Sequence, residues 1–291
     1  MLSDQLARST AFDGQVRIFA AVSTSLVNDL QRRHQLWPVA TAALGRTVTV
    51  TAMMGMMLDD GKVTVQIKGD GPLRQIVADA DSSGHVRGYV HNPFVDLPLN
   101  TRGKLDVAGA VGSGFLYVLK DLGMGEPYRG SVPLVSGELG EDFTYYFTVS
   151  EQTPSAVGVG VLVNPDLSVQ AAGGWILQRM PGADDLLMEQ VIEHVNRLPA
   201  VSSLVADGIS VEQLIEMVAG PEGNPRIHEV IPLELACTCS EQRVEQMLKG
   251  LGRQELASIL EEQGEAEVIC QFCNERYLLG REDLERLIRE H

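Results

Sequence analysis

The four cysteines of this chain constrain its fold more than any other feature. The first of them is residue 237, so the long N-terminal part of the chain has none. They form two close pairs, Cys237 with Cys239 and Cys270 with Cys273. Two pairs of thiolates brought together supply the tetrahedral set of soft ligands that zinc favours in structural sites. The spacing therefore predicts one zinc ion bound by all four cysteines.

A site with four protein ligands is closed, which argues against hydrolytic zinc catalysis, since that chemistry needs an open position for water. His228 is the nearest further candidate ligand. A lone polar histidine ahead of a domain is usually a surface residue, and we expect that here. A cytoplasmic chain does not normally keep structural disulfides, which argues against a disulfide framework.

The same spacing permits a second chemistry. Cysteines this close in sequence can form a disulfide with each other once the metal has left, because their Cα atoms can fall within disulfide range. Oxidation of the thiolates removes them as ligands. Spacing alone leaves open both a static structural zinc and a redox switch, and it favours the static zinc.

Residues 232–291, which contain the cysteines, are expected to form a small zinc domain. A unit of about 60 residues is only marginally stable by itself. Thiolate-bound zinc contributes on the order of 10 kcal/mol or more to folds of this size. We therefore expect loss of the metal to unfold this domain and to loosen anything docked against it.

Residues 1–179 are predicted to form one α+β domain, because helix patterns and strand patterns are segregated along the segment instead of alternating. A helix capped by Ser23 or Ser25 should end near His34, and a second helix should span 38–58. Strands follow where apolar and polar residues alternate or where apolar runs lie between turns. They are expected at 63–67, 73–80, 85–91, 115–120, 156–163 and 168–177.

Residues 180–231 are predicted to be a linker of short amphipathic helices. Helical periodicity is present at 184–196 and 210–219, between glycines and prolines. Their apolar faces are too large to remain in water, so the linker should dock on a folded partner. In the zinc domain, helices are expected at 241–249, 253–262 and 282–290.

The charge of the chain limits its partners. The formal net charge is −16, and an acidic surface repels phosphate backbones, so we expect no nucleic-acid partner. No run of 18 apolar residues occurs, and charged residues interrupt the first thirty, so neither a membrane span nor a signal peptide is expected. The expected location is the cytoplasm.

Other conspicuous residues favour a structural role. Met53, Met54, Met56 and Met57 could form an adaptable surface that binds other proteins, but we expect them to pack within a buried helix. The aromatic residues at 145–147 should also belong to the core. We find no nucleophile with a suitable base near it in sequence, so the chain is not expected to be an enzyme.

Several motifs, taken in order along the chain, carry a resemblance to a known family. Together with the cysteine pattern, the chain resembles the redox-regulated heat-shock chaperones, the thirty-three-kilodalton chaperonins, over nearly its whole length. The motifs lie at 63–72, 120–123, 127–128, 150–155, 172–175, 178 and 181–182.

The resemblance implies a dimeric holdase that works without ATP. In such proteins the reduced, zinc-bound thiolates keep the chaperone inactive. Oxidation under unfolding conditions forms one disulfide within each close pair, releases zinc and unfolds the tail and linker, which exposes apolar surface to unfolding client proteins. By this resemblance, Cys237 would pair with Cys239, and Cys270 with Cys273.

Two alternatives compete with this interpretation. The first is a thiol–disulfide oxidoreductase that uses Cys270 and Cys273, but such a motif normally opens a helix, whereas here it lies between two expected strands. The second is a zinc-ribbon protein that binds nucleic acid or ribosomes. Residues 232–291 contain 7 Lys and Arg against 13 Asp and Glu, a net charge of −6, which argues against it.

Overall fold

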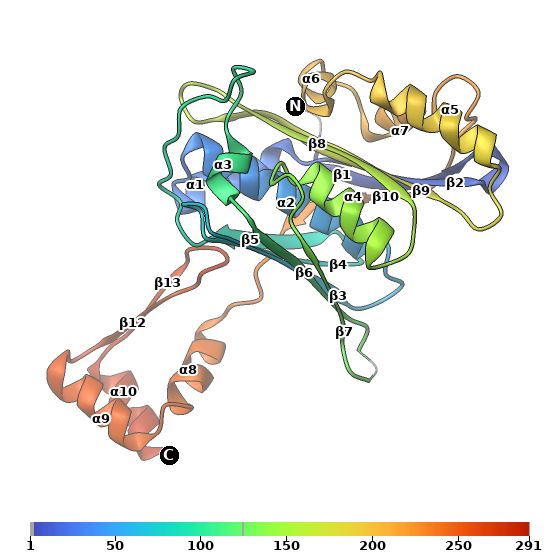
Figure 1. Cartoon of the computed structure of the whole chain (residues 1–291). Helices are drawn as coiled ribbons and strands as arrows, with labels where there is room; N and C mark the ends of the chain where they lie inside the picture. The colour runs from blue at the N-terminus through green and yellow to red at the C-terminus, as the bar shows by residue number, and fades with distance from the viewer. Residues whose placement is uncertain (1–2, 124, 291) are drawn as a thin grey trace. The chain divides into compact units, whose positions relative to one another are not determined.

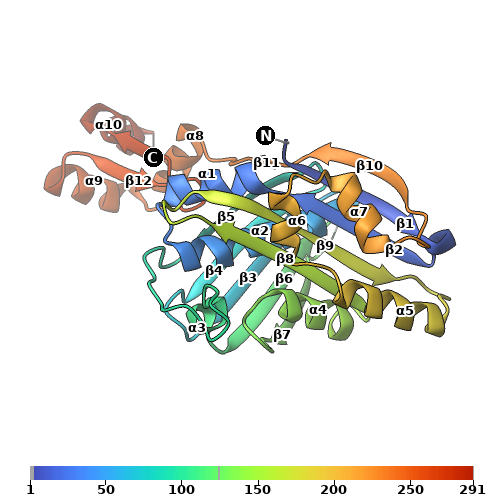
Figure 2. The same ribbon diagram turned by 90° about the horizontal axis from the view of Figure 1, so that it is seen from above.

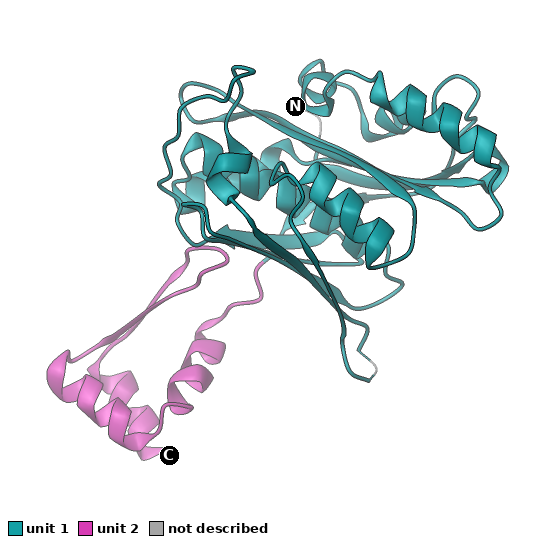
Figure 3. Cartoon of the chain, in the orientation of Figure 1, with its two compact units in different colours: residues 1–236 teal, residues 237–291 magenta. Residues whose placement is uncertain are grey.

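The computed structural model describes residues 3–123 and 125–290 and contains two compact units. The first unit spans residues 1–236 and the second spans residues 237–291 (Figure 3). Residues 232–236, placed with the zinc domain in the sequence analysis, lie in the first unit. Leu233 is buried in the core of that unit, and the strand that follows it pairs with the main chain of the first unit.

Two β-sheets form the first unit. One has five strands in the order β10-β1-β2-β9-β8, and the other has six in the order β11-β5-β4-β3-β6-β7. Every pair is antiparallel except β11 with β5. The strands are β1 (Gln5–Ala11), β2 (Val16–Val22), β3 (Lys62–Gly69), β4 (Gln75–Asp81), β5 (His85–Val90), β6 (Gly114–Asp121), β7 (Tyr128–Pro133), β8 (Ser155–Val163), β9 (Val169–Arg179), β10 (Arg226–Pro232) and β11 (Glu234–Leu235).

Helices lie between and outside these sheets (Figures 1 and 2). A short 3-10 turn, Phe12–Gly14, joins β1 to β2. The α-helices are α1 (Thr24–His34), α2 (Pro38–Met56), α3 (Val107–Val111), α4 (Gly140–Val149), α5 (Asp185–Asn196), α6 (Val201–Ala206) and α7 (Val211–Ala219). The segregated order of helices and strands confirms the α+β class.

Helix α2 forms the centre of the first unit, between the two sheets (Figure 1). Pro38 occupies its first turn, where a missing N–H costs nothing, and Arg46 is its one charged residue. Its buried threonines donate hydrogen bonds to carbonyls one turn earlier, as Thr47 does to Ala43, so no hydroxyl is left unpaired. The prediction that the methionines pack in a buried helix is confirmed for 53, 54 and 56, and Met57 is partly buried. No helix in residues 3–123 or 125–290 is both long and apolar enough to cross a membrane.

The five-stranded sheet is covered on both faces. Residues alternate along its strands, so that Phe19 faces α2 while Ile18 and Ala20 face the opposite side. Helices α5, α6 and α7 pack on that opposite side (Figure 1). Leu214 of α7 is fully buried there. Residues 180–219, the helical part of the predicted linker, are therefore docked, as their apolar faces require.

Some side chains of this segment remain in solvent. Leu186 is 64% exposed and Ile192 is 48% exposed, although both were expected to need a packing partner. Both lie on α5, whose inner face buries Met188, Val191 and Val195. The helix therefore has one buried stripe and two exposed apolar residues outside it.

The second unit is small and simple. It contains α8 (Glu241–Lys249), α9 (Arg253–Glu262), the two-stranded sheet of β12 (Ala266–Ile269) and β13 (Arg276–Leu279), and α10 (Arg281–Arg289). Its core consists of few buried side chains, centred on Leu256, Leu284 and Leu287. A core this small supplies little stability of its own.

Sequence periodicity predicted the long elements but not several short ones. Helices α1, α2, α5, α7, α8, α9 and α10 and strands β3, β4, β5, β6, β8 and β9 are confirmed. Local periodicity did not predict strands β1, β2, β7, β10 and β11 or helices α3, α4 and α6. Strand β10 is stabilised by pairing with β1, more than two hundred residues away in the chain, and this long-range contact leaves no local pattern.

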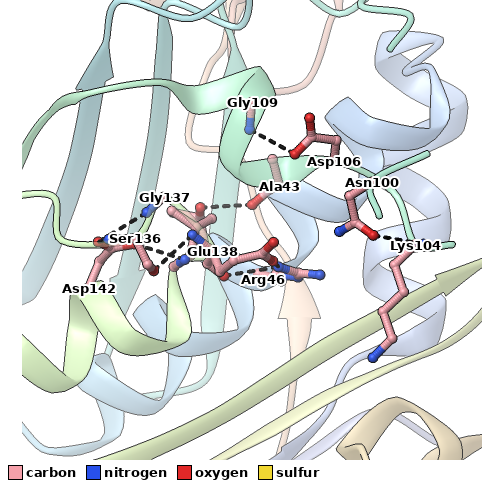
Figure 4. A network of polar contacts seen from close by, with 12 residues as sticks. Ala43, Arg46, Asn100, Lys104, Asp106, Gly109, Ser136, Gly137, Glu138 and Asp142 are labelled. Atoms are coloured by element: carbon pink, nitrogen blue, oxygen red, sulfur yellow. Dashed lines mark hydrogen bonds and ion pairs between the residues drawn. The ribbon is translucent and has the colours of Figure 1, made fainter. Parts of the chain in front are cut away.

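A buried carboxylate organises the turn before α4. Asp142 is fully buried, and its two oxygens accept hydrogen bonds from successive amides of the preceding loop (Figure 4). Leu139, the residue that caps the helix, has φ of +73°, a strained conformation for a side chain with a Cβ. The carboxylate offsets that strain by binding the amides of Val135, Ser136, Gly137 and Leu139.

We expect Asp142→Ala to destabilise the first unit by about 3 kcal/mol, because removing the carboxylate leaves several buried amides without an acceptor. The measurement is urea unfolding followed by tryptophan fluorescence, since Trp37 and Trp175 both lie in this unit. Glu141→Ala, at the exposed neighbouring position, is the control and should change the free energy of unfolding by less than about 0.5 kcal/mol. Equal effects of the two variants would contradict this account.

Candidate metal centre

Two short segments of the second unit bring the cysteines together. Cys237 and Cys239 lie just before α8, which Ser240 caps by accepting a hydrogen bond from the Arg243 amide. Cys270 and Cys273 lie in the turn between β12 and β13, as the sequence predicts. The turn is closed on the Cys270 backbone: its amide donates to the Glu275 carbonyl, and its carbonyl accepts from the Asn274 amide.

The four sulfur atoms form one cluster. All four are thiols and not disulfides, and their Sγ atoms lie within 4.8 Å of one another. The Sγ atoms of Cys237 and Cys270 are 3.7 Å apart, and those of Cys239 and Cys273 are 3.3 Å apart. Four sulfurs bound to one ion at about 2.3 Å would be separated by about 3.8 Å in a tetrahedron. The donor set and its spacing therefore fit a tetrahedral metal ion that prefers thiolates.

The surroundings give the thiols different acidities. Burial alone would raise the pKa of the Cys237 thiol, but hydrogen bonds from the Cys239 amide and from the other thiols outweigh burial and lower that pKa to about 7. Burial raises the pKa of Cys239 and of Cys273. Cys237 is therefore the most ready of these three to ionise at neutral pH, and a bound cation would favour the thiolate form of all of them.

Tyr277 of β13 contacts the cluster through a hydrogen bond to one of its sulfur atoms. Its hydroxyl lies 3.1 Å from the Sγ atom of Cys239, to which it donates a hydrogen bond, and this bond raises the pKa of Tyr277. The sequence analysis missed this residue. The signal was present, because in β13 alternate side chains face inward, and Tyr277 is directed inward two residues before the buried Leu279.

Other residues considered in the sequence analysis belong to the first unit, whereas the cluster belongs to the second. His228 belongs to β10 of the first unit, where its Nε2 atom is 2.8 Å from the hydroxyl of Thr10. Tyr146 and Phe147 are fully buried and Tyr145 is partly buried, which confirms that they belong to the core.

We expect the reduced chain to bind one Zn²⁺, and Tyr277→Phe to weaken that binding on the order of tenfold, because groups that hydrogen-bond to metal ligands orient them and tune their basicity. Competition with a coloured chelator measures the affinity. Tyr128→Phe removes an exposed hydroxyl that donates to the Ser150 carbonyl and serves as the control. Unchanged zinc affinity in the Tyr277 variant would show that its hydrogen bond does not support the site.

Comparison with known proteins agrees with this architecture. A family model described as Hsp33 protein matches residues 4–280. Proteins named 33 kDa chaperonin from Geobacillus sp. (strain WCH70) and Bacillus subtilis (strain 168) are each 50% identical to the chain. The alignments cover 98% of this chain and 97% and 98% of those proteins, respectively.

A solved structure is similar over the full length. The crystal structure of the 33 kDa chaperonin, a heat shock protein 33 homolog, from Thermotoga maritima matches with a TM-score of 0.93 and 37% identity. The match covers 99% of each chain. On the family match, the identity and the shared fold, the chain belongs to the Hsp33 family of chaperonins.

Proposed function

We propose that this protein is a redox-regulated holdase chaperone that needs no ATP. Reduced and zinc-bound, it is inactive. Oxidation of the four cysteines to two disulfides activates it to bind unfolding proteins. The observation that carries the proposal is the cluster of four thiols within 4.8 Å of one another, in a unit that has only a small core of its own. Such a unit depends on its ligand set to stay folded, so a change in the thiols becomes a change in folding.

Zinc is the metal that suits this site best. Tetrahedral sites with four sulfur ligands are characteristic of zinc or iron–sulfur centres, and the role proposed here requires a metal whose thiolates remain open to oxidation. Four protein ligands leave no position for water, so the metal would supply structure and not catalysis. Cys237, Cys239, Cys270 and Cys273 would all bind it.

The proposed oxidation links neighbours in sequence. In each pair, two thiols lose two protons and two electrons to an oxidant such as a peroxide, which is reduced to water, and one S–S bond forms. In the folded unit close contacts also run across the pairs, from Cys237 to Cys270 and from Cys239 to Cys273, within a cluster whose four Sγ atoms all lie within 4.8 Å of one another. Once the unit unfolds, only sequence neighbours remain close, because closing a longer loop costs more entropy.

We propose that the chain responds in three stages. Residues 237–291, the second unit, would unfold first, the linker at 180–231 would then lose support, and residues 1–179 would remain folded. The linker helices bury Leu214 and Ile215 completely against the five-stranded sheet. Releasing them would expose apolar surface on the helices and on the sheet, and unfolding proteins bind to such surface through the hydrophobic effect.

The remaining parts of the proposal follow the family. We propose a cytoplasmic homodimer active under stress whose partners are unfolded or aggregating proteins, with no nucleic-acid or membrane partner and no enzymatic activity. The relatives' description as chaperonins supports client binding. A thiol–disulfide oxidoreductase is not favoured, because Cys270 and Cys273 lie in a turn between two strands and not at a helix N-terminus that would lower their pKa.

We expect peroxide treatment under mildly unfolding conditions to give the pairs Cys237–Cys239 and Cys270–Cys273. Peptide mapping after alkylation of free thiols identifies them. Cys239→Ser is the matched control, since it should leave Cys237 reduced while the other disulfide still forms. A map dominated by links between the two pairs would contradict the proposed order of unfolding and oxidation.

We expect Leu214→Glu to release the linker in the reduced protein. The change removes about 1.5–3 kcal/mol of apolar burial and places a charge in the interface. In limited proteolysis, the reduced variant should then be cleaved within 180–231 several-fold faster than the reduced parent. The reduced variant should also suppress aggregation of a client protein, whereas the reduced parent should not.

Leu186→Glu makes the same chemical change on the same segment at an exposed position and should leave both measurements unchanged. In the parent protein, oxidation should accelerate cleavage within 180–231 as the variant does. Equal protection of this segment in the reduced and oxidised parent would overturn the switch, even if all four cysteines bind zinc.

A further inference from the structure

A groove in the first unit has no role in the function proposed so far. It encloses about 700 Å³ along β8. One wall is the segment 195–203, which includes the start of α6, and the other is formed by the loop 99–105 and by Pro38, Ala42 and Arg46 of α2. A volume of this size is within the range of binding sites for small ligands and short peptides.

The groove follows the open edge of the five-stranded sheet. Strand β8 is the last strand of that sheet and pairs only with β9 among the described residues. The groove is lined from both faces of the sheet, by Ala42 on the α2 side and by Trp175 and Ser202 on the α6 side. A cavity that contacts both faces of a sheet must pass around the edge of the strand.

The backbone of β8 is available at this edge. The Val157 amide points away from β9, because it donates to the hydroxyl of Thr144 on α4. Antiparallel pairing alternates, so Val159 and Val161 also direct their amide and carbonyl groups away from β9, into the groove. Gly158 and Gly160 lie between them and add no side chains that could shield the strand.

This edge lacks the usual protection against pairing. Sheet edges in soluble proteins generally carry charges, prolines or bulges that discourage another strand from adding. Residues 155–161 of β8 contain no charged residue and no proline, and the one register shift lies at the far end, between Leu162 and Val163. Helix α4 already engages the start of this stretch at the Val157 amide, so the unprotected part is 158–161, which lines the groove.

The charge of the groove is opposite to that of the protein. The chain has a net charge of −16, yet Arg46 and Lys104 are the charged residues among the described residues that line the groove. The Arg46 Nη1 atom binds Glu138, while its buried Nε atom has no hydrogen-bond partner. The Lys104 side chain extends from its loop toward the strands (Figure 4).

We propose that this groove binds an extended polypeptide segment, which adds to β8 as a further strand. The segment would pair its backbone with Val159 and Val161, place small apolar side chains on both sides of the edge, and present a carboxylate to Lys104 and Arg46. An extended backbone is the partner whose amides and carbonyls match those of a strand edge. This inference rests on the proposed function and names the place where the chaperone first engages an unfolded client.

The linker limits the length of the segment. Residues 195–203 form one wall, and Ser202 lies close against Gly160. With this wall in place, the groove admits a short peptide in either redox state. Release of the linker would uncover more of the sheet for longer clients.

The test uses the full-length protein, reduced and oxidised, and a short fluorescein-labelled peptide that alternates valine with threonine and carries one aspartate. Fluorescence anisotropy should show binding in both redox states, and hydrogen exchange should show slower exchange in 155–163 when the peptide is bound. Lys104→Glu should weaken binding about tenfold, through charge repulsion. The control is Arg102→Glu, which makes an equal change of charge at an exposed residue of the same loop that does not line the groove. This variant should bind the peptide as tightly as the parent does.

Val159→Pro removes an amide that faces the groove without removing a bond to β9 and should abolish peptide binding. Circular dichroism checks that the Val159→Pro variant folds. If this variant does not fold, the Lys104→Glu variant still tests the proposal.

The proposal that the groove binds a peptide would be wrong if Lys104→Glu left peptide binding unchanged, or if the peptide slowed hydrogen exchange only in other strands. Either result would leave the proposed chaperone activity untouched. Conversion of a dimer to a monomer by Val159→Pro would assign the edge to a second copy and also overturn the peptide proposal. Failure of the oxidised parent to suppress aggregation, with peptide binding intact, would instead contradict the proposed function.

Discussion

The convergence of four thiols is the constraint on which the second unit depends. Its core contains few buried side chains, and its sheet has only two short strands. Bringing Cys237 and Cys239 to the turn that holds Cys270 and Cys273 closes a loop that contains α8, α9 and β12. A metal that binds all four sulfurs stabilises this closure, while oxidation or loss of the ligands removes it. Chemistry at four atoms can thus control the folding of an entire unit.

The first unit has the opposite character. Helix α2 is buried between two sheets, and both faces of the five-stranded sheet are covered. One cover, α2, is nearly free of charge and enclosed on all sides. The other cover, α5 to α7, is amphipathic and exposes Leu186 and Ile192 to solvent. The proposed function requires that this second cover can leave while α2 and the core between the two sheets stay in place.

The sequence predicted the cluster of four cysteines and the longer elements because their signals are local. Cysteine spacing indicated that the four thiols meet, and periodicity indicated helices such as α1 and α7. Strand β10 escaped prediction because its pairing partner, β1, is distant in the chain. Helix α4 escaped because the hydrogen bonds from the preceding loop to the Asp142 carboxylate, although local, leave no periodic pattern in the sequence. Tyr277 escaped because its importance depends on a hydrogen bond to Cys239 that only the folded hairpin creates. The open edge of β8 is likewise a property of strand order, which no local pattern encodes.

Light scattering of an aggregating client protein tests the central claim most directly. The same preparation is compared in two states, reduced and zinc-loaded or oxidised and zinc-free, in the absence of ATP. We predict that the oxidised protein suppresses aggregation at amounts comparable to the client, that the reduced protein does not, and that reduction followed by zinc restores the inactive state. Equal suppression by the two states, or none by either, would contradict the account.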